Sequence, residues 1–160
     1  MIGLMRASET GWLRALRTYA IFTVIGHLIW EIGHVPLYTI WTEGSWGEIA
    51  FAVVHCTGGD LLIAMSTLLL ALFLFGSNRW PGERAAPILV ATILFGVGYT
   101  IFSEWLNITV REAWAYREIM PVIPIIDAGL TPILQWLIIP TVAYLGALRQ
   151  GPGAGRAEHA

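Results

Sequence analysis

Four apolar windows, each long enough to cross a lipid bilayer, constrain this chain more than any other feature of its sequence. A transmembrane helix needs about 20 mostly apolar residues, and such windows occupy residues 19–40, 49–75, 86–106 and 122–148. The windows do not alternate between apolar and polar residues, as the strands of a membrane barrel would. The sequence therefore predicts an all-α integral membrane protein, with four helices packed as a bundle in one domain over residues 1–148.

Composition agrees with this class and excludes several others. Only 12% of the 160 residues are charged and 56% are apolar, about half the charge of an ordinary soluble domain. Nine arginines against eleven acidic residues leave a net charge of -2, without the basic face that nucleic-acid binding needs. The single cysteine, Cys56, excludes an intrachain disulfide and a cysteine-based zinc or iron–sulfur site. The expected partners are membrane lipids, and a transport path through so small a bundle would require a homo-oligomer.

Arginine placement predicts how the helices are oriented. Basic residues collect on the cytoplasmic side of membrane proteins. Two arginines, Arg111 and Arg117, lie between the third and fourth windows, and the other seven lie on the opposite side: Arg6, Arg14, Arg17, Arg79, Arg84, Arg149 and Arg156. We therefore expect both termini in the cytoplasm of a multi-pass membrane protein, in the inner membrane if the source is bacterial.

Two segments outside the four windows have their own expected structure. Residues 107–121 interleave aromatic and charged side chains, which is typical of a short helix lying on the membrane interface, and this helix could act as a lid. Residues 149–160 are rich in Gly, Ala and Pro and are expected to be a disordered tail.

Polar residues gather in one half of the predicted bilayer. His27, Glu31 and His34 follow one another at spacings of four and three, so they share one helical face. With alternating helix directions, the polar residues of the other windows map to the same outer half: His55, Asp60, Tyr99, Glu104, Asp127 and Gln135, with Trp136 beside them. This arrangement predicts a polar pocket that opens to the outside.

The charge of that pocket must be balanced. It contains four carboxyl groups, and the four windows contain no Arg or Lys, while an ionisable residue inside a membrane costs about 3 kcal/mol. Protons on the carboxyl groups, protonated histidines or a bound metal cation are the three ways to offset this cost.

Metal binding is the function that the sequence favours by a small margin. His27, Glu31, His34 and His55 offer three imidazoles and a carboxylate, a ligand set suited to zinc, copper or iron, for transport, storage or catalysis. Asp60, Glu104 and Asp127 would orient the imidazole rings. Haem held by His34 and His55 is a further alternative, and the nearby carboxylates disfavour it.

Acid–base catalysis without a metal is the main alternative, with His27, Glu31 and Asp60 as the catalytic groups. The stretch from His27 to Glu31, together with Trp136 four residues before Pro140, resembles the EXPERA domain of sterol isomerases and emopamil-binding proteins. The resemblance implies a lipid-facing cavity in which His27 and Glu31 shuttle a proton, Asp60 is a second acid and Trp136 stabilises a carbocation. His34 has no counterpart in that family. A structural membrane subunit, whose polar residues only hold helices together, is the remaining alternative, so enzymatic activity is left open.

Overall fold

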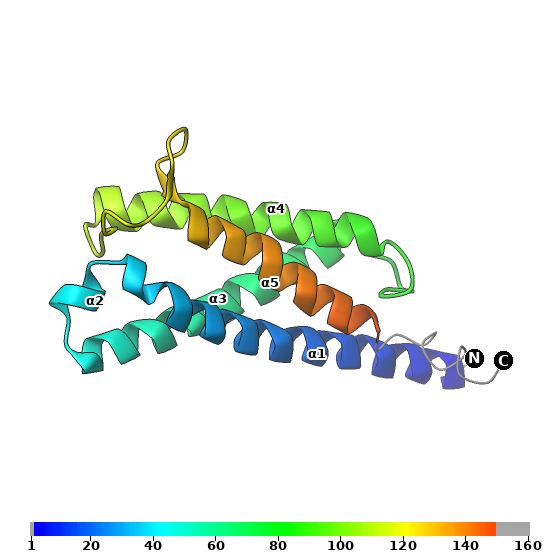
Figure 1. Cartoon of the computed structure of the whole chain (residues 1–160). Helices are drawn as coiled ribbons and strands as arrows, with labels where there is room; N and C mark the ends of the chain where they lie inside the picture. The colour runs from blue at the N-terminus through cyan, green and yellow to red at the C-terminus, as the bar shows by residue number, and fades with distance from the viewer. Residues whose placement is uncertain (1, 150–160) are drawn as a thin grey trace.

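The computed structural model describes residues 2–149, and four long helices account for most of them (Figure 1). These are α1 (Ile2–His34), α3 (Trp46–Phe75), α4 (Ala85–Glu104) and α5 (Leu130–Leu148). Four segments are long and apolar enough to cross a membrane: Gly11–Leu37, Trp46–Phe75, Ala85–Val110 and Leu130–Leu148. The prediction of four helices that are long and apolar enough to span a membrane is confirmed. The expected tail lies outside the described residues from residue 150 onward.

Local sequence signals set the ends of these helices. Pro36 disfavours helical backbone at the residue before it, and α1 gives way at His34 to a short 3-10 helix over Val35–Leu37. The four-residue helix α2 (Ile40–Glu43) follows. Helix α3 starts with a capping box, in which the Ser45 side chain and the Glu48 backbone N–H pair while the Glu48 carboxylate accepts from Ser45. Such reciprocal bonds satisfy backbone donors that a helix start leaves free.

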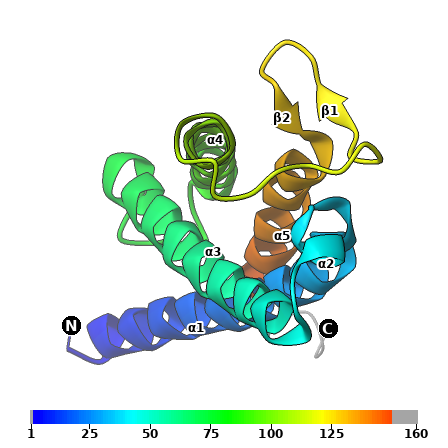
Figure 2. The same cartoon turned by 90° about the vertical axis from the view of Figure 1, so that its left-hand side faces the viewer.

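The long helices pack as a ring in which each helix has two neighbours. Helix α1 packs against α3 and α5, and α4 packs against the same two helices. Figure 2 shows α4 nearly end-on, with α3 and α5 on either side of it and α1 running across below. Helices α3 and α5 therefore lie at opposite corners, and long side chains from both can meet at the centre.

The two ends of this ring differ. We call one the turn end, because it holds the connection between α3 and α4 together with the start of α1 and the end of α5 (Figure 1). The larger apolar core lies toward this end and includes Leu68, Trp80 and Tyr144. We call the other the hairpin end, where a smaller core surrounds Val35, Ile49 and Val53.

The hairpin end departs from the predicted structure. Helix α4 continues as a π-helix over Trp105–Val110, but residues 111–121 form no interfacial helix. Their backbone pairs instead with the connection after α1, where Arg117 N donates to Leu37 O and Thr39 N donates to Ala115 O. These pairings satisfy backbone groups that a helix would have satisfied internally.

The fourth spanning helix also begins later than the predicted residue 122. A two-stranded hairpin comes first, with β1 (Val122–Ile123) antiparallel to β2 (Ala128–Gly129). Because Ile123 precedes Pro124, its backbone favours an extended conformation. Helix α5 therefore starts at Leu130 and is 19 residues long.

Candidate functional site

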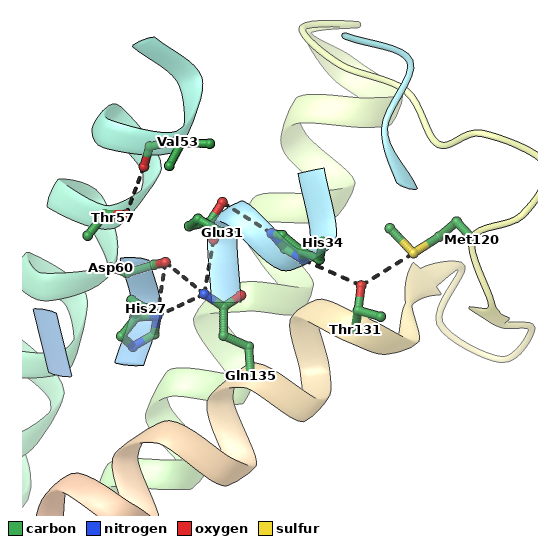
Figure 3. A network of polar contacts seen from close by, with 9 residues as sticks. All are labelled: His27, Glu31, His34, Val53, Thr57, Asp60, Met120, Thr131 and Gln135. Atoms are coloured by element: carbon green, nitrogen blue, oxygen red, sulfur yellow. Dashed lines mark hydrogen bonds and ion pairs between the residues drawn. The ribbon is translucent and has the colours of Figure 1, made fainter. Parts of the chain in front are cut away.

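A buried cluster of five polar side chains occupies the centre of the ring, where α1, α3 and α5 meet (Figure 3). Gln135 of α5 is its hub, because the Gln135 Nε2 atom lies 2.8 Å from Nδ1 of His27 and 3.0 Å from Oε1 of Glu31. The same atom lies 3.0 Å from Oδ2 of Asp60, on α3. We call His27, Glu31, His34, Asp60 and Gln135 the polar cluster.

Each histidine of the polar cluster faces a carboxyl group. His27 Nδ1 lies 3.0 Å from Asp60 Oδ2, and this pair joins α1 to α3. His34 Nε2 lies 3.1 Å from Glu31 Oε2, within α1. Imidazole and carboxyl groups at this distance share a proton, which either partner can carry.

The hydrogen-bond count shows that ionisable groups supply protons inside the cluster. An amide nitrogen carries two hydrogens, so Gln135 cannot donate to His27, Glu31 and Asp60 at once. The His27 to Asp60 contact needs a proton of its own, on the ring or on the carboxyl group. If the amide is turned around, its oxygen faces two carboxyl oxygens, and both carboxyl groups must then be protonated. In either orientation the cluster holds protons that can move between its members.

Burial makes these protons necessary. His27 is fully buried, and Glu31 and His34 are exposed by 8% and 7%. A charge inside a membrane is costly unless it is paired, and the cluster contains no arginine or lysine to pair with its two carboxyl groups. The Asp60 side chain, at 15% exposed, is the most accessible of the paired groups. Protons held within the cluster therefore neutralise its carboxyl groups, and Asp60 is the member that a ligand can reach.

A second polar group adjoins the cluster at the hairpin end. The Tyr116 hydroxyl donates to the Glu104 carboxylate and accepts from the backbone N–H of Gly129, at 2.8 Å. Burial, and next the Glu104 carboxylate, raise the pKa of Tyr116 well above its usual value near 10, so the phenol remains a donor. The Tyr38 ring lies 5.4 Å from the His34 ring and 5.5 Å from the Tyr116 ring. Burial, with Glu104 next, likewise raises the pKa of Tyr38.

Trp136 closes the cluster on the side of the turn end. Its ring centroid lies 5.2 Å from that of His27, with the planes tilted by 53°. The residue is 2% exposed, and it fits because α4 has a glycine opposite it. A Cβ atom at Gly96 would overlap the Trp136 indole. Gly96 is thus a residue of the site that sequence reasoning missed.

Three residues expected in the pocket lie elsewhere. His55 is exposed and stacks on Phe51, with ring centroids 5.4 Å apart. Residues five apart in a helix point in directions about 140° apart. Because Asp60 faces the centre of the ring, the His55 side chain points outward. Tyr99 is 46% exposed on α4. Asp127 is exposed in the hairpin with a positive φ of 49°, before the start of α5.

This placement removes one member of the expected metal ligand set. His55 is separated from His27, Glu31 and His34, which leaves two imidazoles near the carboxyl groups. Within residues 2–149, no group of three or more His, Cys, Asp or Glu side chains is arranged to hold a metal ion.

The sequence named Gln135 only as one of several polar residues of the pocket, whereas the structure puts it at the hub. Tyr116 was expected at the membrane surface, and its bond to Glu104, 12 residues earlier, depends on the irregular path of residues 111–121. No local pattern could have indicated that contact.

The fold and the cluster define a class, a helical protein that has four segments able to span a membrane and a buried group of histidines and carboxyl groups. In comparisons with known proteins, no family model, no curated protein and no solved structure matches the chain.

Proposed function

We propose that the protein is a membrane-embedded acid–base enzyme that moves a double bond in a lipid or isoprenoid. The observation that carries the proposal is the Gln135 amide, which lies within 3.0 Å of His27, Glu31 and Asp60. The amide brings together two carboxyl groups and an imidazole that exchange protons. General acid–base catalysis requires groups of this kind close to one another.

The reaction needs one acid and one base close together. A protonated carboxyl group of the cluster donates its proton to one carbon of the double bond, which forms a carbocation. A basic member of the cluster then removes a proton from the neighbouring carbon, and the electrons of that C–H bond form the shifted double bond. The cluster ends with as many protons as it had, so no cofactor or co-reactant is consumed.

Roles follow the resemblance to the EXPERA domain. Glu31 and His27 shuttle the proton, and Asp60 acts as the second acid. Trp136 lies against His27, and an indole face attracts a cation, which suits the stabilisation of a carbocation. Gln135 holds the three proton-carrying groups in reach of one another.

An apolar substrate fits the surroundings of the cluster. Asp60, the most accessible of the paired groups, lies within α3, one of the four segments that are long and apolar enough to cross a membrane. A substrate that reaches Asp60 therefore passes through an apolar environment. Metal binding has less support, because His55 points away from the two remaining imidazoles.

The test uses deuterium transfer from solvent to lipid. The purified protein is placed in nanodiscs with a mixture of sterols and polyprenyl lipids in D2O, and the lipids are analysed by mass spectrometry. We expect the wild-type protein to produce double-bond isomers that carry deuterium. Glu31→Gln should reduce this rate by about 100-fold or more, the usual contribution of a general acid or base.

Glu43→Gln is the matched control, because it makes the same change at an exposed position in α2. It should retain the wild-type rate. A wild-type rate in Glu31→Gln, or no deuterium in any lipid with the wild-type protein, would refute the proposal.

A further inference from the structure

A row of buried polar groups leads from the polar cluster toward the turn end. Tyr19, Thr23 and His27 follow one another at steps of four residues along α1, and each is 0% exposed. Residues four apart lie on the same face of a helix. In each of the three, a side-chain atom has no hydrogen-bond partner within the described part of the chain: the Tyr19 hydroxyl, Thr23 Oγ1 and His27 Nε2.

Among the described residues, three of the four other buried threonines pair their hydroxyls. The hydroxyls of Thr57, Thr67 and Thr92 donate to backbone carbonyls one turn earlier in their own helices, at 2.8 to 3.1 Å. A buried threonine in a helix thus has a ready partner. Helix packing alone does not account for a row of three unpaired polar atoms on one face of α1.

Tyr19, the first member of the row, shares the core of the turn end with two aromatic residues, Tyr144 and Trp80. Trp80 Nε1 donates to the Tyr144 hydroxyl at 2.8 Å, and Trp80 lies in the connection between α3 and α4. At the other end of the row, His27 contacts Asp60 and Gln135. Polar groups therefore extend along α1 from the turn end to the cluster.

We propose that Tyr19, Thr23 and His27 form a proton path that connects the polar cluster to the turn end of the protein. Hydroxyl and imidazole groups accept a proton on one atom and release one from the same group, which permits transfer along a row. Successive members are separated by about 6 Å of helix rise, a gap that a bridging water molecule spans.

The overall transfer conserves atoms and charge. One proton leaves water at the turn end and one proton arrives at a carboxylate of the cluster, while every group in the row regains its starting state. Beyond the cluster, Glu31 contacts His34, and Thr131 Oγ1 lies 3.5 Å from His34 Nδ1 toward the hairpin end. The path therefore continues toward the opposite side of the membrane. It requires that the cluster exchanges protons but requires no lipid substrate.

Proton flux into liposomes tests the path. The full-length protein is reconstituted into potassium-loaded liposomes that contain a pH-sensitive dye, and valinomycin sets a membrane potential that drives protons inward. We expect the wild-type protein to acidify the liposomes faster than empty liposomes. Thr23→Val, which keeps the side-chain shape, should lower the flux by about tenfold, equivalent to about 1.4 kcal/mol in the transfer barrier.

Thr92→Val is the matched control, because Thr92 is equally buried but its hydroxyl is paired with the Ile88 carbonyl. It should keep the wild-type flux. Tyr19→Phe is a second test, since it removes only an unpaired hydroxyl, and it should lower the flux as Thr23→Val does. Thermal unfolding establishes that each variant is folded.

Three results would overturn the path: no flux above that of empty liposomes, wild-type flux in both Thr23→Val and Tyr19→Phe, or an equal loss in Thr92→Val. These results are independent of the lipid assay. Deuterated isomers without flux would refute the path alone, and flux without deuterated isomers would refute the isomerase alone.

Discussion

A neutral amide separates two carboxyl groups at the centre of the ring. Gln135 stands between the carboxyl groups of Glu31 and Asp60, inside helices that offer them no arginine or lysine partner. An amide can donate to both groups without adding charge. A cationic residue there would hold both carboxyl groups ionised, and an apolar one would leave them without a donor.

Replacing this hub with an apolar residue of similar size should weaken the fold. Gln135→Leu removes the amide from the buried His27 and Glu31 and from the partly buried Asp60, and we expect a loss of about 2 kcal/mol, in line with hydrogen bonds between membrane helices and with unpaired buried groups. Unfolding by SDS in mixed micelles measures the change. Thr131→Val is the comparison, because the Thr131 hydroxyl makes only a bond to the weak acceptor Met120 Sδ and a 3.5 Å contact to His34 Nδ1, and it should be near neutral. Equal stability of Gln135→Leu and the wild-type protein would contradict the hub role.

At the scale of the element, α1 carries most of the ionisable side chains of the cluster, and α4 leaves the space that a large neighbouring side chain fills. Helix α1 carries His27, Glu31 and His34 in the cluster, and the buried row extends the same face toward its start. Helix α4 contributes a small residue where α5 has a large one. Gly96 allows the Trp136 ring to lie close to the α4 backbone, and this close approach places the indole against His27.

Alanine substitutions at two glycines of α4 test whether Gly96 makes room for Trp136. Gly96→Ala should displace Trp136 and destabilise the protein by about 1 to 3 kcal/mol, as overpacking of a core does. Gly98→Ala changes the same helix where a Cβ atom meets nothing within 4 Å, so it should be neutral or stabilising by up to about 1 kcal/mol through helix propensity. Tryptophan fluorescence and SDS unfolding report the two effects. The close packing of Trp136 on Gly96 would be refuted if both variants were as stable as the wild type.

At the scale of the whole molecule, the two ends of the ring differ in charge and in structure. The turn end carries an exposed ion pair between Arg79 and Glu83, and Arg14 and Arg17 are exposed near the start of α1. The hairpin end carries the groups that join residues 111–129 to α1 and α4. The distribution of arginines predicts that the turn end faces the cytoplasm.

Labelling of single cysteines in intact cells tests this orientation. In a Cys56→Ser background, Asn78→Cys places a thiol at the turn end and Glu118→Cys places one at the hairpin end, both at exposed positions. A maleimide that cannot cross membranes should label Glu118→Cys in intact cells and Asn78→Cys only after lysis, since six of the eight arginines within residues 2–149 lie on the turn side. The reverse pattern would show that the protein is inserted the other way.

Much of the architecture follows from local sequence, because hydrophobic length determines whether a helix can span a bilayer. The four helices long enough to span and the shared face of His27, Glu31 and His34 could be predicted in this way. The first window was expected to continue to residue 40, whereas α1 ends at His34, before Pro36. The spacing of four residues from Tyr19 to Thr23 and from Thr23 to His27 is also visible in the sequence, although no prediction was based on it.

Only the tertiary structure decided which polar residues meet. His55 and Asp60 lie near each other in sequence, yet the rotation of α3 directs one outward and the other to the centre. The meeting of Gln135 with Asp60, 75 residues earlier, depends on the ring arrangement that sets α3 and α5 at opposite corners. Helix formation is governed by the residues of the helix itself, whereas such long-range contacts depend on how helix faces pack, which no short stretch of sequence encodes.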